Sequence, residues 1–133
     1  MDELKKQKAP KFRSVDELID YLPENELKVF NHLRHIIFDS LPHVKEKLSY
    51  NVPFYYGRKR ICFLWPGSVP WGSTVQSGVQ MGLCYGSLLN QYGFYFTLEK
   101  RKWVTMKTFL TLEEIDSSIL QSCLWEADTI DKL

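Results

Sequence analysis

VKEKLSYNVPFYYGRKRICFLWP, residues 44–66, and GVQMGLC, residues 78–84, are the stretches that decide the fold. Apolar and polar residues alternate over Val44–Val52 and again in the second stretch, a pattern that is typical of short strands with one buried face. Pro53 and the turn residues 57–60 separate the first strands from one another. Both stretches lie between segments with helical periodicity. The first prediction is therefore a sheet flanked by helices.

Three segments have the pattern of amphipathic helices. The first, residues 14–22, opens with the capping-box sequence Ser14-Val-Asp-Glu17, whose serine and glutamate side chains can satisfy backbone N–H groups of the first turn. The second, residues 23–41, begins with proline, which a helix tolerates best in its first turn. The third follows another capping box at residues 111–114. The buried faces of the two longer helices are marked by Val29, Phe30, Leu33, Ile36, Ile37 and Leu41, and by Leu112, Ile115, Ile119, Cys123, Ala127 and Ile130.

The strand at residues 61–65, ICFLW, is apolar on both faces, which predicts a central position in the sheet. Residues 94–98 and 102–107 are expected to form a further hairpin through residues 99–101. The order helix, helix, strands, helix lacks the βαβ alternation of parallel sheets. We predict an α+β domain whose mainly antiparallel sheet has about five or six strands, with two N-terminal helices and one C-terminal helix packed on one face.

A chain of 133 residues with 44% hydrophobic content is expected to form one compact domain. Residues 1–13 are polar and rich in lysine, which predicts a mobile basic arm before a single domain over residues 14–133. The N-terminus lacks the apolar core of a secretory signal, and no apolar stretch is long enough to span a bilayer. We therefore expect a cytoplasmic location and no membrane partner.

Charge and cysteine content argue against several kinds of site. The 17 basic and 16 acidic residues leave a net charge of +1, which supplies no general field for attracting nucleic acid. Cys62, Cys84 and Cys123 are far apart and odd in number, which argues against a disulfide framework and against a zinc site. They are expected to be reduced, mostly buried thiols, and no cofactor is predicted.

Residues 46–54, EKLSYNVPF, follow a helix that ends in Ser40-Leu-Pro42. This combination resembles the motif of the YdhG-like family, a domain of unknown function in which a helix ends in proline and a strand with acidic, tyrosine and proline residues follows. Further matches are the strand at residues 79–83 followed by Gly86-Ser-Leu-Leu89, and the terminal helix that leads to Glu126-Ala127. The resemblance covers residues 15–130. It implies a compact α+β fold with helices on one side of the sheet, and the one biochemical role that it suggests is that of a frataxin-like intracellular iron chaperone.

Iron handling requires clustered oxygen ligands, because iron ions bind carboxylates well. The candidate ligands are the acidic residues of the first two helices, Asp16, Glu17, Asp20, Glu24 and Glu26. Basic residues close by in the sequence reduce the negative field there. A second candidate is a stripe on the second helix with metal-ligand spacing, formed by Lys28, His32, His35 and Asp39. Iron binding is thus an alternative function, while solvated polar helix faces are the simpler interpretation.

GLCYG, residues 82–86, has the spacing of a nucleophile elbow, with Cys84 in place of serine. Such an elbow needs a sharp turn between a strand and a helix and a histidine that activates the nucleophile. All three histidines lie upstream, on or beside one helix. A thiol-dependent enzyme is a further alternative, and a buried structural cysteine is the simpler interpretation.

Two basic triplets, Arg58-Lys59-Arg60 and Lys100-Arg101-Lys102, lie near aromatic residues, as in proteins that bind single-stranded nucleic acid. Both triplets fall on predicted turns. In a plain meander we expect these two turns at opposite ends of the sheet, where they cannot form one groove. Nucleic acid is therefore not the expected partner.

The face of the sheet without helices is the best candidate for a binding surface. It is expected to present Tyr50, Trp65 and Trp103, together with Trp71 from the long loop at residues 66–78. Exposed apolar area of this kind usually marks a ligand cavity or an interface. The alternative is that the loop folds back over this face as a lid. We predict a non-enzymatic binding domain for a small ligand or a protein partner, which includes a second copy of the chain.

Overall fold

The structure of the protein is a computed structural model, and it describes residues 9–71, 75–91, 93–98 and 101–133. The helices are α2 (Val15–Tyr21), α3 (Glu24–Ser40) and α4 (Ser117–Asp131), and the strands are β1 (Lys45–Ser49), β2 (Val52–Tyr56), β3 (Arg60–Pro66), β4 (Val79–Leu83) and β5 (Thr105–Phe109). The five strands follow one another across the sheet in the order β1-β2-β3-β4-β5, and every neighbouring pair is antiparallel. The prediction of an α+β fold with an antiparallel sheet is confirmed.

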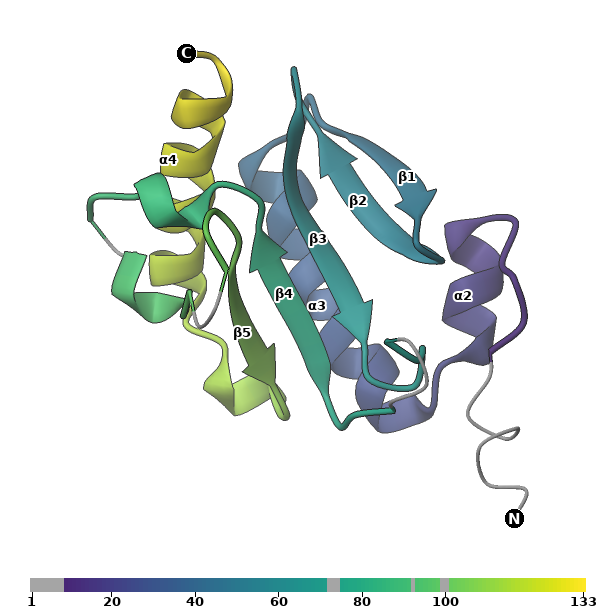
Figure 1. The fold of residues 1–133 in the computed structure, drawn as a ribbon. Helices are drawn as coiled ribbons and strands as arrows, with labels where there is room; N and C mark the ends of the chain where they lie inside the picture. The colour runs from purple at the N-terminus through teal and green to yellow at the C-terminus, as the bar shows by residue number, and fades with distance from the viewer. Residues whose placement is uncertain (1–8, 72–74, 92, 99–100) are drawn as a thin grey trace.

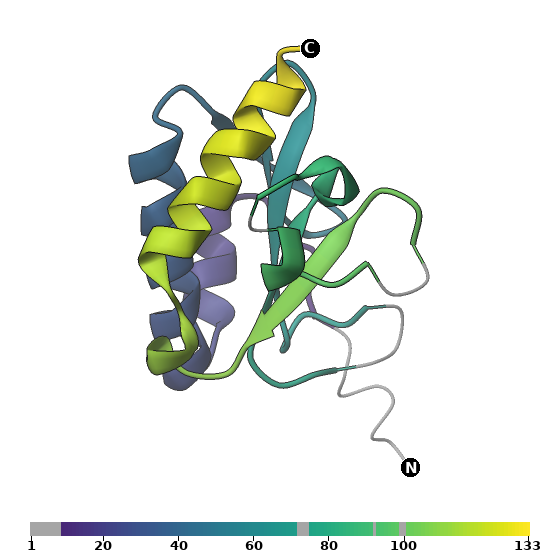
Figure 2. The ribbon, with the colours of Figure 1, turned by 90° about the vertical axis from the view of Figure 1, so that its left-hand side faces the viewer.

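The helices cover one side of the sheet. In Figure 1, α3 lies behind the strands, and Figure 2 shows α3 and α4 side by side on one side while the loops after β3 and before β5 extend on the other. The amphipathic pattern explains this arrangement, because α3 buries its predicted apolar stripe: Val29, Phe30, Leu33, Ile36 and Ile37. The side opposite the helices is called the open side below. Loops, and not helices or strands, cover part of the open side.

A tight turn at Tyr50 and Asn51 joins β1 to β2. These two residues have φ angles of 55° and 70°, and two consecutive positive φ values form the hairpin turn whose twist matches that of the flanking strands. The alternation over Val44–Val52 therefore does not belong to one strand, as the sequence suggested, because β1 ends at Ser49 and the chain then reverses.

Residues 9–13, which the sequence placed in a mobile arm, contact the domain at the same turn. Phe12 is buried and its ring meets Tyr21 edge to face, with 5.2 Å between the ring centroids. The Phe12 backbone N–H donates to the Asn51 side-chain oxygen at 2.8 Å. This part of the predicted arm is thus anchored, and the remainder, residues 1–8, lies outside the described residues.

The start of the C-terminal helix differs from the sequence prediction. Thr111 makes no side-chain capping hydrogen bond, and residues 112–114 form a 3₁₀ turn. The helix begins instead after Asp116, whose carboxylate accepts a hydrogen bond from the Ile119 N–H at 3.1 Å. Two competing N-cap residues precede the same apolar stripe, and the aspartate caps the longer helix.

The predicted hairpin over residues 94–107 is present in reduced form. Residues 93–95 form a 3₁₀ turn, and Thr97 and Met106 form an isolated antiparallel bridge. The expected connection at residues 99–100 lies outside the described residues. The segment before β5 is therefore mainly loop, and it reaches the open side of the sheet.

Two rows of side chains cross the middle of the sheet. One row, the helix-side row, consists of Tyr55, Cys62, Leu83 and Thr105, and the other, the open-side row, consists of Phe54, Phe63, Gly82 and Met106. The first row faces the helices, since the Tyr55 ring packs edge to face against Phe38 of α3 with centroids 5.6 Å apart. Alternation along each strand then directs the second row to the open side.

A charged network closes the helix side near β1. The Arg34 guanidinium donates to both carboxylate oxygens of Glu46, at 2.7 and 2.8 Å, and the Tyr55 hydroxyl donates to the same carboxylate at 2.8 Å. Burial, followed by the nearby Glu46 carboxylate, raises the pKa of Tyr55 well above its ordinary value. The acidic residue of the 46–54 motif therefore has a structural partner on α3.

Candidate functional site on the open side of the sheet

The open side contains a cavity of about 470 Å³. The four aromatic residues predicted from the sequence, Tyr50, Trp65, Trp71 and Trp103, all line it. They come from the β1–β2 turn, from β3 and from the loops that follow β3 and precede β5. Small-molecule sites in proteins usually have volumes of about 300–1,000 Å³, so this cavity has the size of a ligand site.

The floor of the cavity is built from aromatic rings on β2 and β3. Phe54 and Phe63 lie 5.0 Å apart between ring centroids, and Phe63 meets Trp65 edge to face at 6.3 Å. Gly82 on the neighbouring strand makes room for this arrangement, because a side chain at that position would overlap the Phe63 ring. The missing side chain on β4 is therefore what allows the Phe63 ring to lie over that strand.

The loop after β3 forms one wall and covers part of the floor. The Trp65 indole N–H donates to the Val69 carbonyl at 3.0 Å, and Trp71 meets the Trp65 ring edge to face at 4.2 Å. Trp65 is 7% exposed, whereas Trp71 is 47% exposed and Tyr50 is 67% exposed. The predicted lid thus exists over Trp65, and the cavity beside it stays open.

Tyr85 and Trp103 form a second wall of the cavity. Their ring centroids lie 6.1 Å apart. Lys59 lies over the Tyr85 ring at 4.9 Å and Lys102 over the Trp103 ring at 5.2 Å, which are cation–π distances. This wall therefore combines exposed aromatic area with positive charge.

Arg60 and Arg101 are the charged side chains that line the cavity within the described part of the chain. The two basic triplets that contain them were predicted at opposite ends of the sheet, and this prediction was wrong. In an antiparallel meander the β2–β3 and β4–β5 connections leave the sheet at the same end, so the two arginines reach one cavity.

A bulge directs Arg60 to the open side. The β2–β3 pairing passes from Tyr55 opposite Cys62 to Tyr56 opposite Arg60, which leaves Ile61 as the extra residue. As a result the Arg60 guanidinium lies over three aromatic rings of the open side.

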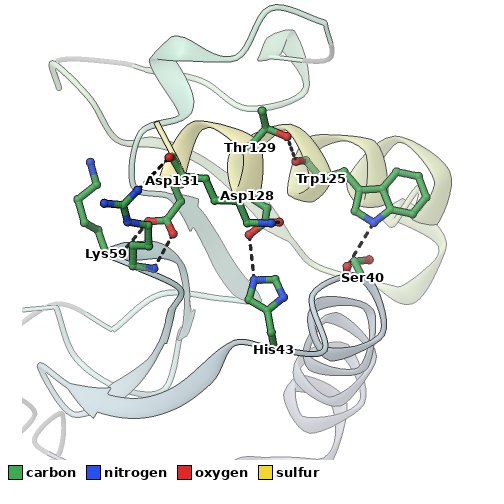
Figure 3. Close-up of polar contacts among 9 residues, drawn as sticks. Ser40, His43, Lys59, Trp125, Asp128, Thr129 and Asp131 are labelled. Atoms are coloured by element: carbon green, nitrogen blue, oxygen red, sulfur yellow. Dashed lines mark hydrogen bonds and ion pairs between the residues drawn. The ribbon is translucent and has the colours of Figure 1, made fainter.

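The C-terminal end of α4 holds the turn that carries Arg60 (Figure 3). The buried Asp131 carboxylate accepts hydrogen bonds from the backbone N–H groups of Arg58 and Lys59, at 2.6 and 2.8 Å. Figure 3 also shows the neighbouring contact of His43 with Asp128, a distance of 2.9 Å. A helix on the closed side thus fixes the turn next to the cavity on the open side.

Cys84 lines the cavity but has the properties of a neutral thiol. Burial raises its pKa from 9.0 to about 12, and the positive charge of Arg60 opposes this only in part. Thiolate is the reactive form of cysteine, so the environment suppresses nucleophilic reactivity. The three histidines, His32, His35 and His43, do not line this cavity.

Two of the acidic residues considered for iron, Glu17 and Glu26, are engaged in separate contacts. Glu17 pairs with Arg13 at 3.2 Å, and Glu26 accepts hydrogen bonds from the backbone and the hydroxyl of Ser68. Within residues 9–71, 75–91, 93–98 and 101–133, no three His, Cys, Asp or Glu side chains are grouped so that they could hold a metal ion.

A larger hollow of about 630 Å³ lies along α4, but its chemistry differs. Apart from Trp125, its lining residues are polar: Asn90, Gln91, Ser122, Glu126 and Thr129. Glu126 is already bonded to the backbone N–H of Asn90 at 2.6 Å. The smaller cavity on the open side has the apolar floor and the few convergent polar groups that are typical of ligand sites.

Comparison with known proteins supplies no relative. No family model matches the chain, and neither a curated protein nor a solved structure matches it. The resemblance to the YdhG-like family therefore stays a prediction. None of the helices in the described part of the chain combines the length and apolar character needed to cross a membrane.

Several residues of the site were not predicted as its members. Phe54, Phe63 and Met106 belong to the open-side row, and their common face depends on strand register, which the sequence pattern does not define. Arg60 and Cys84 were noticed, but for nucleic-acid binding and thiol chemistry respectively. One signal could have placed Arg60 and Arg101 in the same site: in an antiparallel meander every second connection lies at the same end of the sheet.

Proposed function

We propose that the protein is a non-enzymatic binding domain that holds a small organic ligand in the aromatic cavity of its open side. The observation that carries this proposal is the convergence of Tyr50, Trp65, Trp71 and Trp103 on one concave cavity of about 470 Å³. Large aromatic side chains supply much of the binding energy in protein recognition sites, and their rings favour flat apolar partners.

The shape of the surface favours a small ligand over a protein partner. A protein partner usually requires about 800 Å² on each side of an interface, and such surfaces are broad rather than concave. Here Trp71 and Trp103 line one cavity together with Phe63 and Trp65. Protein–protein contact, a homodimer included, remains the competing hypothesis.

Tryptophan fluorescence tests the proposal, because three of the four tryptophans line the cavity. Trp125 lies on α4, where its indole N–H donates to the Ser40 carbonyl (Figure 3). A Trp125→Phe variant therefore retains the cavity tryptophans and removes the distant one. Screening this variant against small aromatic and aliphatic compounds should give saturable fluorescence changes.

Two controls define the outcome. In Trp71→Ala the fluorescence change should weaken, since this substitution removes a wall while leaving the floor in place. Size-exclusion chromatography with light scattering should give a monomer. A stable dimer whose formation protects Trp71 from a soluble quencher, combined with no response to any compound, would overturn the proposal in favour of the protein-interface hypothesis.

A further inference from the structure

We infer that the ligand of this cavity is a flat aromatic carboxylate whose anionic group is bound by Arg60. This inference rests on the proposed function and adds the chemical class of the ligand. It follows from the charge of the cavity, from the surroundings of Arg60 and from the shape of the walls.

The cavity is positive although the chain as a whole is nearly neutral. The net charge is +1, yet the charged residues that line the cavity in the described part of the chain are two arginines and no carboxylates. Both guanidinium groups lie within cation–π distance of aromatic rings of the open side. The local field therefore favours a negatively charged ligand.

Arg60 is held in place without a carboxylate partner among the described residues. Its Nε donates to the Tyr56 hydroxyl at 3.1 Å and one terminal nitrogen donates to the Ser49 hydroxyl at 3.1 Å. Its guanidinium carbon lies 4.7 Å from the centre of the Phe54 ring and 5.6 Å from that of Tyr50. These neutral contacts orient the guanidinium, and no carboxylate among the described residues pairs with its charge.

The contrast with Arg34 on the helix side supports this interpretation. Two nitrogens of the Arg34 guanidinium donate to the two oxygens of the Glu46 carboxylate, which is the bidentate geometry that a guanidinium prefers. Arg60 has the same chemical group beside hydroxyls and aromatic rings, and no carboxylate among the described residues lines the cavity with it. A ligand carboxylate would supply the partner that Glu46 supplies on the other side.

The walls favour a flat ring attached to that carboxylate. Trp71 and Trp103 are about half exposed, so their ring faces and edges are available to a ligand. Arg101 lies over the Trp71 ring at 5.7 Å, which places a second positive charge at the same rim. Planar apolar groups gain the most from aromatic walls, through offset stacking and edge contacts.

Three probes of matched shape test the inference on the unmodified protein: 1-naphthoate, the neutral 1-naphthalenemethanol and the cationic 1-naphthylmethylammonium. Titration calorimetry should show the anion binding about tenfold or more tightly than the alcohol, since a hydrogen bond to a charged group typically contributes that much. The cation should bind most weakly.

Arginine variants assign the preference to one residue. Arg60→Gln should remove the preference for the anion, while Arg58→Gln should retain it. Arg58 lies on the same turn and loses the same charge, but it does not line the cavity. Thermal melting checks that the variants are folded, and the comparison of the three probes on the unmodified protein needs no variant.

The outcomes separate the inference from the proposed function. Equal binding of all three probes, weakened in each case by Trp71→Ala, would overturn the anion inference and support the proposed ligand site. An anion preference that survives in Arg60→Gln would overturn the assignment to Arg60. A complete lack of response by the cavity tryptophans, to these probes and to the wider set of compounds, would overturn the proposed function itself.

Discussion

The two sides of the sheet use neighbouring residues of the same strands in different ways. On the helix side, Tyr55, Cys62 and Leu83 are fully buried under α3 and α4. On the open side, Phe54 and Phe63 are 5% and 7% exposed, and they are covered by loops and by one another's rings. The helix side is closed by regular structure, whereas the open side is partly covered and retains a cavity.

The comparison shows how stability and binding can be separated in a small domain. The helix side carries the apolar core and a satisfied ion pair, so changes there should act mainly on folding. The open side carries exposed rings and an arginine without a carboxylate partner among the described residues, so changes there should act mainly on binding. The predictions below test this division, beginning with the largest expected effect.

The sharpest test concerns two cysteines on the two sides. Burial raises the pKa of Cys84 from 9.0 to about 12, which lowers its thiolate fraction at pH 8 by roughly a thousandfold. Alkylation of Cys84 in the folded protein should be much slower than in the urea-unfolded chain, although the residue lines the cavity. Cys62, fully buried on the helix side, should react only after unfolding. Mass spectrometry of the alkylated peptides measures both rates, and rapid labelling of folded Cys84 would show that a thiolate is stabilised there.

Neighbouring side chains on and near β3 should differ in their contribution to stability. Leu64 is fully buried on the helix side, so Leu64→Ala should lower the free energy of unfolding by about 3 kcal/mol. Trp71→Ala removes a larger side chain from the open side, yet it should cost less than about 1 kcal/mol because Trp71 is 47% exposed. Urea denaturation measures both. Equal losses would mean that the open side is part of the core.

A methyl group on the open-side row should be costly for a steric reason. Gly82→Ala places a Cβ against the Phe63 ring, and displacement of this ring should lower stability by about 2 kcal/mol and reduce the cavity. In the double variant with Phe63→Leu, part of this cost should be recovered, since the smaller side chain leaves room for the methyl group. A double-mutant cycle measures the coupling, and strict additivity would contradict the proposed ring contact.

The sequence contained most of the fold and the four aromatic residues of the site, but not the other residues that line the cavity. Strand alternation and helical periodicity predicted the α+β architecture and the central position of residues 61–65, because both patterns depend on local burial. The turn at Tyr50 and Asn51 was missed because it lacks the glycine that usually marks two consecutive positive φ angles. The approach of Arg60 and Arg101 depends on which sheet end each turn occupies, and a composition pattern does not contain that information.

Asp131 connects α4 on the helix side to the turn beside the cavity, and its substitution should have a smaller effect on stability. Asp131→Asn replaces one of the two acceptor oxygens with an NH2 group, which cannot accept a hydrogen bond. One of the bonds from the Arg58 and Lys59 N–H groups is then lost, so stability should fall by about 1.5 kcal/mol. The matched variant Asp128→Asn affects the contact with the half-exposed His43 and the ion pair with the exposed Lys132, and it should cost less than about 1 kcal/mol. If the turn positions Arg60 as inferred, Asp131→Asn should also weaken 1-naphthoate binding more than Asp128→Asn does. Calorimetry and urea denaturation of the two variants provide the comparison.

The smallest effect concerns Glu26, which ties α3 to the loop of the open side through Ser68. Burial raises the pKa of Glu26 above its ordinary value of 4.5, and the hydrogen bonds from Ser68 offset this only in part. The folded state therefore holds the proton more tightly than the unfolded chain, so this contribution to stability is fully present below pH 4.5 and is lost as the pH rises through the raised pKa.

Glu26→Gln should accordingly flatten this part of the pH profile and leave stability at neutral pH equal or slightly higher. Glu24→Gln, an exposed substitution at the start of the same helix, is the control for losing one carboxylate. Urea denaturation at several values between about pH 4 and pH 7 measures the slopes. A steeper loss of stability towards low pH in the unmodified protein than in Glu26→Gln would reverse the sign and indicate that Ser68, rather than burial, dominates the pKa of this carboxyl group.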